Sequence, residues 1–213
     1  MKVELISVFG NDQTIVDVAR VSYNKKANNY TEEQNTKLIN YLVKNKHTSP
    51  FRHPQIQFRI ECCIYIERQL FKHQIGMSAN SISGRYCDFS DTYTLIQDWR
   101  KQSIDSKQGS SESLDYESQE SCNIIEHKVI ETCKKAYKDL IDLGVSKEQA
   151  RTILPLNLNT QFIWTGSLLS FIHLFKLRLK SDAQTETREL VQLMLNQLKE
   201  NSSFKHSLKA FEL

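Results

Sequence analysis

Residues that form disulfides or favour turns are scarce in this sequence. Its 213 residues include 3 prolines, 6 glycines and 5 cysteines. The number of cysteines is odd and no pair has the spacing of metal ligands, so we predict neither a disulfide framework nor a metal site. Unpaired thiols are typical of a reducing compartment, and we expect the protein to be cytoplasmic.

Long apolar runs and a strong charge of one sign are also missing. No apolar run approaches the roughly 20 residues that a membrane-spanning helix needs, and the first residues alternate like a strand rather than a signal peptide. We therefore expect neither membrane insertion nor export. The 28 basic and 25 acidic residues give a net charge of +3, which is too small to require a nucleic-acid partner. Any anion site must come from particular residues.

Hydrophobic periodicity predicts one helix-rich α+β domain spanning residues 1–213. Alternation with a period of two indicates strands at 3–9, from 55 toward 66, and at 162–164. Spacing near 3.6 predicts one helix after the cap Asn11 and another behind Thr31. Further helices are expected at 124–143, from Ser146 to just before Pro155, at 168–179 and at 182–199.

One stretch has almost no large apolar residues. Positions 101–121 are rich in Ser, Gln, Asp and Glu. Such a segment buries too little apolar surface to offset its ordering entropy. We therefore expect a flexible polar insertion on the surface.

Polar and charged groups crowd together between residues 68 and 86. Gly84 precedes Arg85, and this pair suits a phosphate, since glycine admits the anion close to the backbone and the guanidinium donates two hydrogen bonds. The alternative is an ordinary capped turn with Arg85 as a solvated charge. Two later arginines bear on the choice. Arg151 lies on a predicted helix just ahead of Pro155, and Arg178 is embedded among apolar residues, where it needs a partner.

In this order and spacing, the segments resemble the flavin-dependent thymidylate synthases. The signature of that family is Arg-His-Arg followed by Ser, Asn-Glu, Ser and Arg-Tyr, matched here by Lys72-His73-Gln74, Ser78, Asn80-Ser81, Ser83 and Arg85-Tyr86. Other echoes of the family are at 19–22, 47–51, 68–69, 150–157 and 164–165, so the resemblance covers most of the chain outside 101–121. It implies the fold of the family, a small antiparallel sheet packed with several helices.

The resemblance implies one-carbon transfer from methylenetetrahydrofolate to C5 of a pyrimidine deoxynucleoside monophosphate, converting dUMP to dTMP. Arg85 and Arg151 would neutralise the phosphate, and Arg178 would donate to the pyrimidine carbonyl during attack at C6. We expect these three guanidinium groups to converge on one mononucleotide. The expected substrate contacts are Gln69, Ser81, Ser83, Gly84, Arg85, Arg151 and Arg178, of which Ser83 and Arg178 are the catalytic candidates. Ser81 replaces the signature Glu, and Ser83 is expected to be a ligand contact rather than a nucleophile.

The resemblance also implies FAD, recharged by NADPH. The expected cofactor neighbours are Ser22, His47, Ser49, Lys72, His73, Gln74, Ile75 and His173. Departures from the family are concentrated here. Both arginines of the signature triplet are replaced, and the stretch before Ser78 is one residue longer. The family's Asn, Arg and Asn contacts correspond to Ser167, Leu169 and His173. Its loop Glu corresponds to Arg52. Either Arg52 and Lys72 compensate with relocated charge, or the cofactor has changed.

Two other functions stay open. Without flavin, water could capture the methylene adduct, making the protein a dUMP or dCMP hydroxymethylase. A degenerate homologue that binds nucleotide or RNA without turnover is the other. The resemblance further implies a homotetramer whose active sites are assembled from several subunits, and the apolar helices 168–179 and 190–198 would suit burial between subunits.

Overall fold

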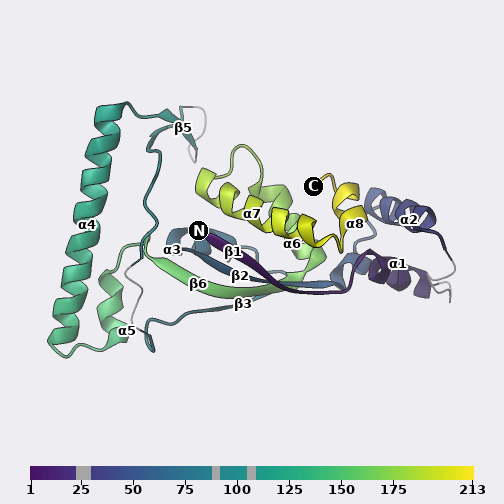
Figure 1. The fold of residues 1–213 in the computed structure, drawn as a ribbon, viewed down its shortest axis with the longest axis horizontal. Coiled ribbons are helices and arrows are strands. Elements are labelled where there is room, and N and C mark those ends of the chain that lie inside the picture. The colour runs from purple at the N-terminus through teal and green to yellow at the C-terminus, as the bar shows by residue number, and fades with distance from the viewer. Residues whose placement is uncertain (23–29, 88–91, 105–108) are drawn as a thin grey trace. The chain divides into compact units, whose positions relative to one another are not determined.

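The computed structural model describes residues 1–22, 30–87, 92–104 and 109–213, and the chain forms two compact units. The first unit contains Glu61–Leu70 and Ser81–Gln161, together with Met1. The second contains Lys2–Ile60, Phe71–Asn80 and Phe162–Leu213. Figure 1 labels most of the elements of the two units.

The second unit is built on a four-stranded sheet in the order β1-β2-β6-β3. These strands are β1 (Lys2–Phe9), β2 (Gln55–Cys63), β6 (Asn159–Ser167) and β3 (Met77–Ser81). In β2 the alternate residues Ile56, Phe58 and Ile60 are fully buried, as expected for a strand with one face on the core. The α+β fold with a small antiparallel sheet is thus confirmed.

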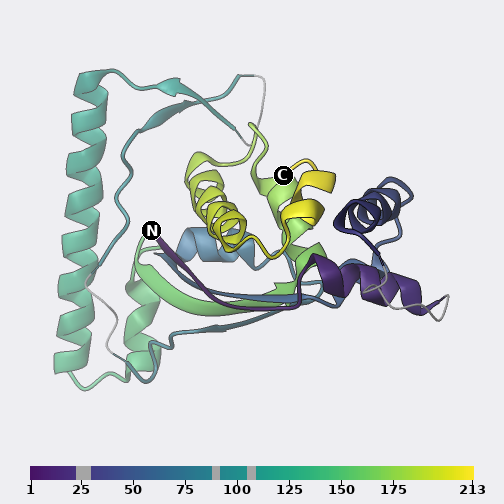
Figure 2. The ribbon, with the colours of Figure 1, turned by 45° about the vertical axis from the view of Figure 1, so that its right-hand side comes forward.

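Two helices of the second unit supply a large part of its core. They are α6 (Leu168–Arg178) and α7 (Thr185–Asn201), and α7 lies over β1 in both Figures 1 and 2. Phe171 of α6 meets Phe58 edge to face, with ring centroids 5.2 Å apart. A second helical group packs together, consisting of α1 (Asp12–Val21), α2 (Glu32–Lys44), the short η2 (Ser49–Arg52) and α8 (Lys205–Ala210).

The first unit is dominated by one long helix, α4 (Tyr116–Asp142), seen at full length in Figure 2. The short helices α5 (Lys147–Ala150) and η3 (Arg151–Ile153) pack against it. The unit also contains α3 (Ile64–Leu70) and a hairpin of β4 (Arg100–Gln102) and β5 (Ser110–Ser113). Within the described ranges, no helix of either unit combines the length and apolarity needed to cross a membrane.

Helix caps account for several confirmed elements. Asn11 and Thr31 each form a capping box, in which the cap side chain accepts the backbone N–H three residues on and that residue's side chain accepts in return. The helix expected at 124–143 begins instead at Tyr116, because Asp115 caps it by accepting from the Ser118 N–H. The strand expected at 162–164 is the centre of a longer one, β6. The sequence patterns missed β3 and α8.

The polar segment at 101–121 has more regular structure than expected. It includes most of β4, all of β5 and the first turns of α4, and Lys101 pairs with Glu112 at 2.7 Å across the hairpin. Cross-strand pairing of opposite charges helps such a hairpin form without a core. Positions 105–108 lie outside the described residues. The flexibility of this segment stays a prediction.

Candidate functional site

The Ser83–Cys87 turn of the first unit follows directly from β3. The Ser83 carbonyl accepts the backbone N–H groups of Tyr86 and Cys87, each at 3.1 Å, and its Oγ accepts the Arg85 N–H at 3.3 Å. Gly84 is buried, whereas Arg85 is exposed with its guanidinium carbon 5.2 Å from the centroid of the Tyr86 ring. The turn is therefore capped by a side chain, and it also presents a guanidinium to solvent. These features match the capped turn with a solvated Arg85, and phosphate binding by this segment stays a prediction.

A carboxylate that the sequence did not single out lies against the same segment. Ser81 Oγ donates to Glu67 Oε1 at 2.5 Å, and Glu67 is half-buried on α3, two residues before the expected contact Gln69. Burial raises the pKa of Glu67, and the hydrogen bond from Ser81 opposes that shift. A carboxylate thus stands one hydrogen bond from the position where the family signature has Glu. No sequence spacing signals this, because the two residues meet only through the fold.

Arg151 lies at the junction of α5 and η3, also in the first unit. Its Nε donates to the Glu148 carbonyl at 3.3 Å, and its carbonyl accepts the Leu154 N–H at 3.2 Å. The helix ends here because Pro155 disfavours helical geometry in the preceding residue. Arg151 is therefore half-buried at a helix end. The first unit holds six of the seven expected substrate contacts: Gln69, Ser81, Ser83, Gly84, Arg85 and Arg151.

The seventh expected contact, Arg178, lies in the second unit as the last residue of α6. Its Nε donates to His73 Nε2 at 3.1 Å, so the partner that an arginine among apolar residues requires is an imidazole. A nitrogen that accepts carries no proton, which places the proton of neutral His73 on Nδ1. Burial lowers the pKa of His73, and the positive charge of Arg178 and the neighbouring His173 lower it further.

The turn that carries His73 is tied to the start of α6. Gly76 has a φ of +71°, a conformation that favours glycine. Ser170 Oγ donates to the Ile75 carbonyl at 2.9 Å, and the Gly76 carbonyl accepts the Ser167 N–H at 3.2 Å. A Cβ at Gly76 would lie 2.5 Å from Ser170 Oγ. These contacts fix the turn against the first residues of α6.

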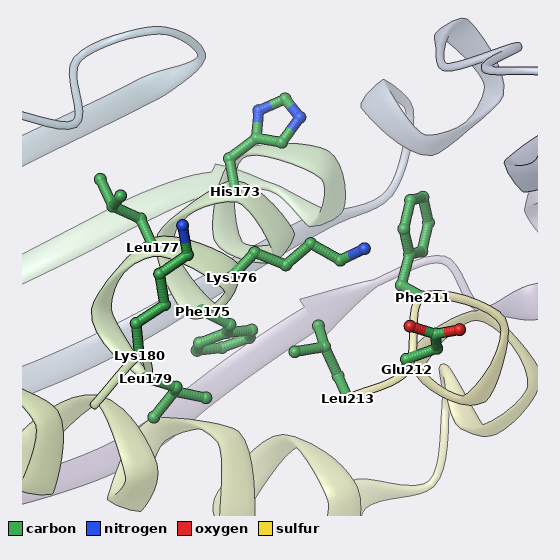
Figure 3. Close-up of a pocket in the computed structure, with 9 residues that line it drawn as sticks. All are labelled: His173, Phe175, Lys176, Leu177, Leu179, Lys180, Phe211, Glu212 and Leu213. Atoms are coloured by element: carbon green, nitrogen blue, oxygen red, sulfur yellow. The ribbon is translucent and has the colours of Figure 1, made fainter. Parts of the chain in front are cut away.

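A cavity of about 590 Å³ opens in the second unit between α6 and the chain's last residues (Figure 3). Lys176 extends toward Phe211, its Nζ 5.3 Å from the ring centroid. Of the expected site residues, the cavity includes His173 alone. Its full lining is His173, Phe175, Lys176, Leu177, Leu179, Lys180, Phe211, Glu212 and Leu213.

Comparison with known proteins settles the family. The family model described as thymidylate synthase complementing protein matches residues 4–202. The flavin-dependent thymidylate synthase of Thermus thermophilus is 36% identical over 198 residues, covering 93% of this chain and 71% of its own. The chain belongs to the flavin-dependent thymidylate synthase family. The Kosmotoga olearia member is 38% identical over 188 residues, covering 88% and 80% of the two chains.

The fold of this flavin-dependent thymidylate synthase family member also matches a solved structure. A UMP/dUMP methylase, PolB from Streptomyces cacaoi bound with 5-Br dUMP, superimposes with a TM-score of 0.86. The match covers 99% of this chain and 94% of that one, at 22% sequence identity. It establishes that the two proteins share a fold.

Two of the positions that correspond to cofactor contacts in the family, Ser167 and Leu169, are buried in this member. Ser167 caps α6 by accepting the Ser170 N–H at 3.2 Å, and Leu169 is only 5% exposed. Neither presents a donor at the surface. The exposed polar side chains among the expected positions still fit an anionic cofactor, because they keep hydrogen-bond donors and one ammonium in solvent. They are Ser22, His47, Ser49, Lys72, Gln74 and His173, joined by exposed Arg52. Ile75, 93% exposed, adds apolar surface.

Proposed function

We propose that this protein transfers one carbon from methylenetetrahydrofolate to C5 of a pyrimidine deoxynucleoside monophosphate, converting dUMP to dTMP. The observation that carries the proposal is the family match over residues 4–202, within which every expected substrate arginine is retained. The curated relatives are named flavin-dependent thymidylate synthases, and the solved structure is of a UMP/dUMP methylase.

Phosphate binding is assigned to Arg85 and Arg151. Guanidinium groups match the oxygens of a phosphate in pairs, and hydrogen bonds between charged partners are stronger than neutral ones. The exposed guanidinium of Arg85 and the half-buried one of Arg151 support this role. Gly84, Gln69 and Ser81 are assigned as neighbouring contacts. Ser83 accepts the Arg85 N–H, so its own hydroxyl proton serves to donate to the substrate.

Arg178 is assigned to the pyrimidine carbonyl. Negative charge develops on the base when C6 is attacked, and a fixed cation stabilises it in the transition state more than in the ground state. The Nε of Arg178 is committed to His73, so donation to the base falls to the Nη groups. Arg178 and Ser83 are the two catalytic residues of the proposal.

FAD is assigned as the cofactor, with NADPH as its reductant. Ser22, His47, Ser49, Lys72, Gln74, Ile75 and His173 would hold it, with His73 adjoining them and Arg52 adding charge. When bound, reduced flavin supplies the hydride that turns the transferred methylene into methyl. The protein's own part is to bind and orient the nucleotide and to stabilise charge on it.

A flavin-independent hydroxymethylase acting on dUMP or dCMP is the second candidate. The inward turn of Ser167 and the burial of Leu169 favour it, since two of the family's cofactor donors have no counterpart at the surface. Water would then take the place of the hydride on the methylene adduct. The same substrate arginines serve both reactions.

Assembly into a homotetramer in the cytoplasm belongs to the same proposal. The apolar faces of α6 and α7 do not support it as expected, because Phe171, Leu174, Leu190 and Leu195 are buried within the chain itself. Helix α4 supports it instead. It buries only Ile130 and exposes the side chains of Ile124, Ile125 and Val129 by 66%, 62% and 47%, an apolar stripe that suits a subunit interface.

The test is product analysis by mass spectrometry with dUMP or dCMP as substrate, methylenetetrahydrofolate present throughout, and FAD with NADPH added or omitted. The proposal predicts dTMP from dUMP only with FAD and NADPH. A hydroxymethyl nucleotide formed without them would establish the second candidate. An unaltered nucleotide under every condition, with the nucleotide bound, would overturn both and leave a non-catalytic binding protein.

A further inference from the structure

We infer that His73 is a positioning residue for Arg178, holding its guanidinium in the orientation that the substrate requires, and that it does so only in its neutral form. The inference rests on the proposed function, because Arg178 acts on the base there. The resemblance places His73 among the cofactor contacts. The structure adds a direct link to the substrate arginine instead.

The hydrogen bond fixes the arginine at its inner end. Nε lies where the guanidinium joins the aliphatic stem, so the 3.1 Å contact with His73 Nε2 constrains the plane of the whole group. Side chains that act on a transition state gain from partners that lock their rotamers. A guanidinium at a helix end has several rotamers available, and this contact selects among them.

The imidazole is itself held in place. The turn from Lys72 to Gly76 is bound to the start of α6 by Ser170 and by the Ser167 N–H. Arg178 ends that same helix. The donor Arg178 and the acceptor His73 are therefore both held by α6, one at each end of the helix. Their relative position is kept as long as the helix is intact.

Protonation of His73 would undo the arrangement. The charged groups that face it are Arg178 and His173, and Lys72 is its neighbour in the chain. Arginine and lysine side chains are cationic, so neither Arg178 nor Lys72 favours protonation of His73. Imidazolium has no acceptor nitrogen, so the hydrogen bond would be replaced by repulsion between two cations. Because the pKa of His73 is lowered, the neutral form persists to a more acidic pH than for a free imidazole.

The kinetic test compares His73→Gln with His73→Leu. Glutamine offers a carbonyl oxygen near the position of Nε2 but does not titrate, whereas leucine offers no acceptor. We expect wild-type kcat for dUMP to fall as pH drops through the pKa of His73. H73Q should keep kcat within about threefold and lose that acidic limb. H73L should lose about 10- to 150-fold in kcat, the equivalent of one charged hydrogen bond, with a smaller change in KM for dUMP.

The matched control is His127→Gln, which removes an exposed imidazole on α4. It should retain both the rate and the acidic limb. Thermal melts of each variant show whether it is folded. Wild-type kinetics in H73L, or an acidic limb that survives in H73Q, would overturn the inference.

A second measurement does not depend on turnover. The imidazole of His73 is titrated by NMR in the wild type and in Arg178→Met, its resonance assigned by its loss in H73Q. Removing the positive charge should raise the pKa of His73 toward the ordinary value of 6.5. An unchanged pKa would show that the two groups are uncoupled. If the wild type turns over no nucleotide, the proposed function fails while this titration still decides the His73–Arg178 link.

Discussion

The arginines assigned to the substrate are held in two different ways. In the second unit, Arg178 donates through Nε to a half-buried imidazole at 3.1 Å. In the first unit, Arg85 stands exposed on a turn, and Arg151 donates through Nε to the carbonyl of Glu148, three residues earlier, at 3.3 Å. The difference corresponds to what each is assigned to bind. A phosphate accepts cations from many directions, whereas a carbonyl on a flat ring requires a donor in one place.

Glu67 in the first unit and His73 in the second also differ in how they contact the expected site residues. Glu67 accepts a hydrogen bond at 2.5 Å from Ser81, four residues before Arg85 in the chain, and burial raises the pKa of Glu67. His73 contacts its arginine directly, and burial lowers its pKa. Each shift favours the neutral form of the group. The following substitutions test whether the fixed arginine and the exposed ones have separable roles.

The largest effect is expected from Arg178→Lys. Lysine keeps the charge but cannot donate to His73 and to the base at the same time, since it has no planar fork. Loss of a fixed donor to developing charge lowers kcat by about 100- to 1000-fold. Steady-state kinetics with dUMP measures it. Arg59→Lys, at an exposed arginine paired with Glu4, is the control, and an equal loss there would mean that the effect is not specific to the site.

Arg85→Ala and Arg151→Ala should act mainly on substrate affinity. Each removes one charge-assisted contact with the phosphate, raising KM for dUMP by about 10- to 150-fold with less change in kcat. Comparing dUMP with deoxyuridine checks the assignment, because the nucleoside has no phosphate to lose. Equal penalties for dUMP and deoxyuridine would contradict it.

Gly76→Ala should loosen the turn that carries His73. The substitution forces a φ of +71° on alanine and sets its Cβ 2.5 Å from Ser170 Oγ. The backbone strain alone costs about 1–3 kcal/mol, and the clash adds to it. Gly144→Ala is matched, since φ is +87° there and a Cβ would meet nothing within 4 Å. Thermal melts should rank G76A below G144A. The reverse order would mean that the contact with Ser170 does not constrain the turn.

The smallest effect is a change in how stability depends on pH in Glu67→Gln. The folded-state pKa of Glu67 is raised, so its contribution to stability is present below the unfolded pKa and is lost as pH rises through the folded pKa. E67Q should lack that decline. Urea unfolding of wild type and E67Q across mildly acidic pH measures the difference. Parallel curves would indicate that the surroundings of Glu67 do not affect its titration.

Local chemistry explains what could be predicted from the sequence. The strand at 3–9, the caps at Asn11 and Thr31 and the apolar helix at 168–179 all follow from residues close together in the chain. The start of α4 could not be predicted in this way, because the first turns of the helix are polar and only the cap at Asp115 indicates them. Likewise β3 (Met-Ser-Ala-Asn-Ser) lacks alternating large apolar residues, and it forms by pairing with β6 rather than by its own pattern.

Contacts between residues far apart in the chain could not be predicted from the sequence. The pattern around Arg178 showed that a partner was needed but not that His73, 105 residues away, provides it. The link between Ser81 and Glu67 is of the same kind. Resemblance to a family transfers roles position by position, so it could mark Ser81 as a departure. It could not show that a carboxylate from α3 lies beside it.

The most direct test of the account follows the carbon itself. Methylenetetrahydrofolate labelled with ¹³C at the methylene group is incubated with the protein, dUMP, FAD and NADPH, and the nucleotide is examined by NMR. The account predicts the label on a new carbon bonded to C5 of the pyrimidine, and its loss in R178K. Label that stays in the folate while dUMP binds to the protein would contradict the account.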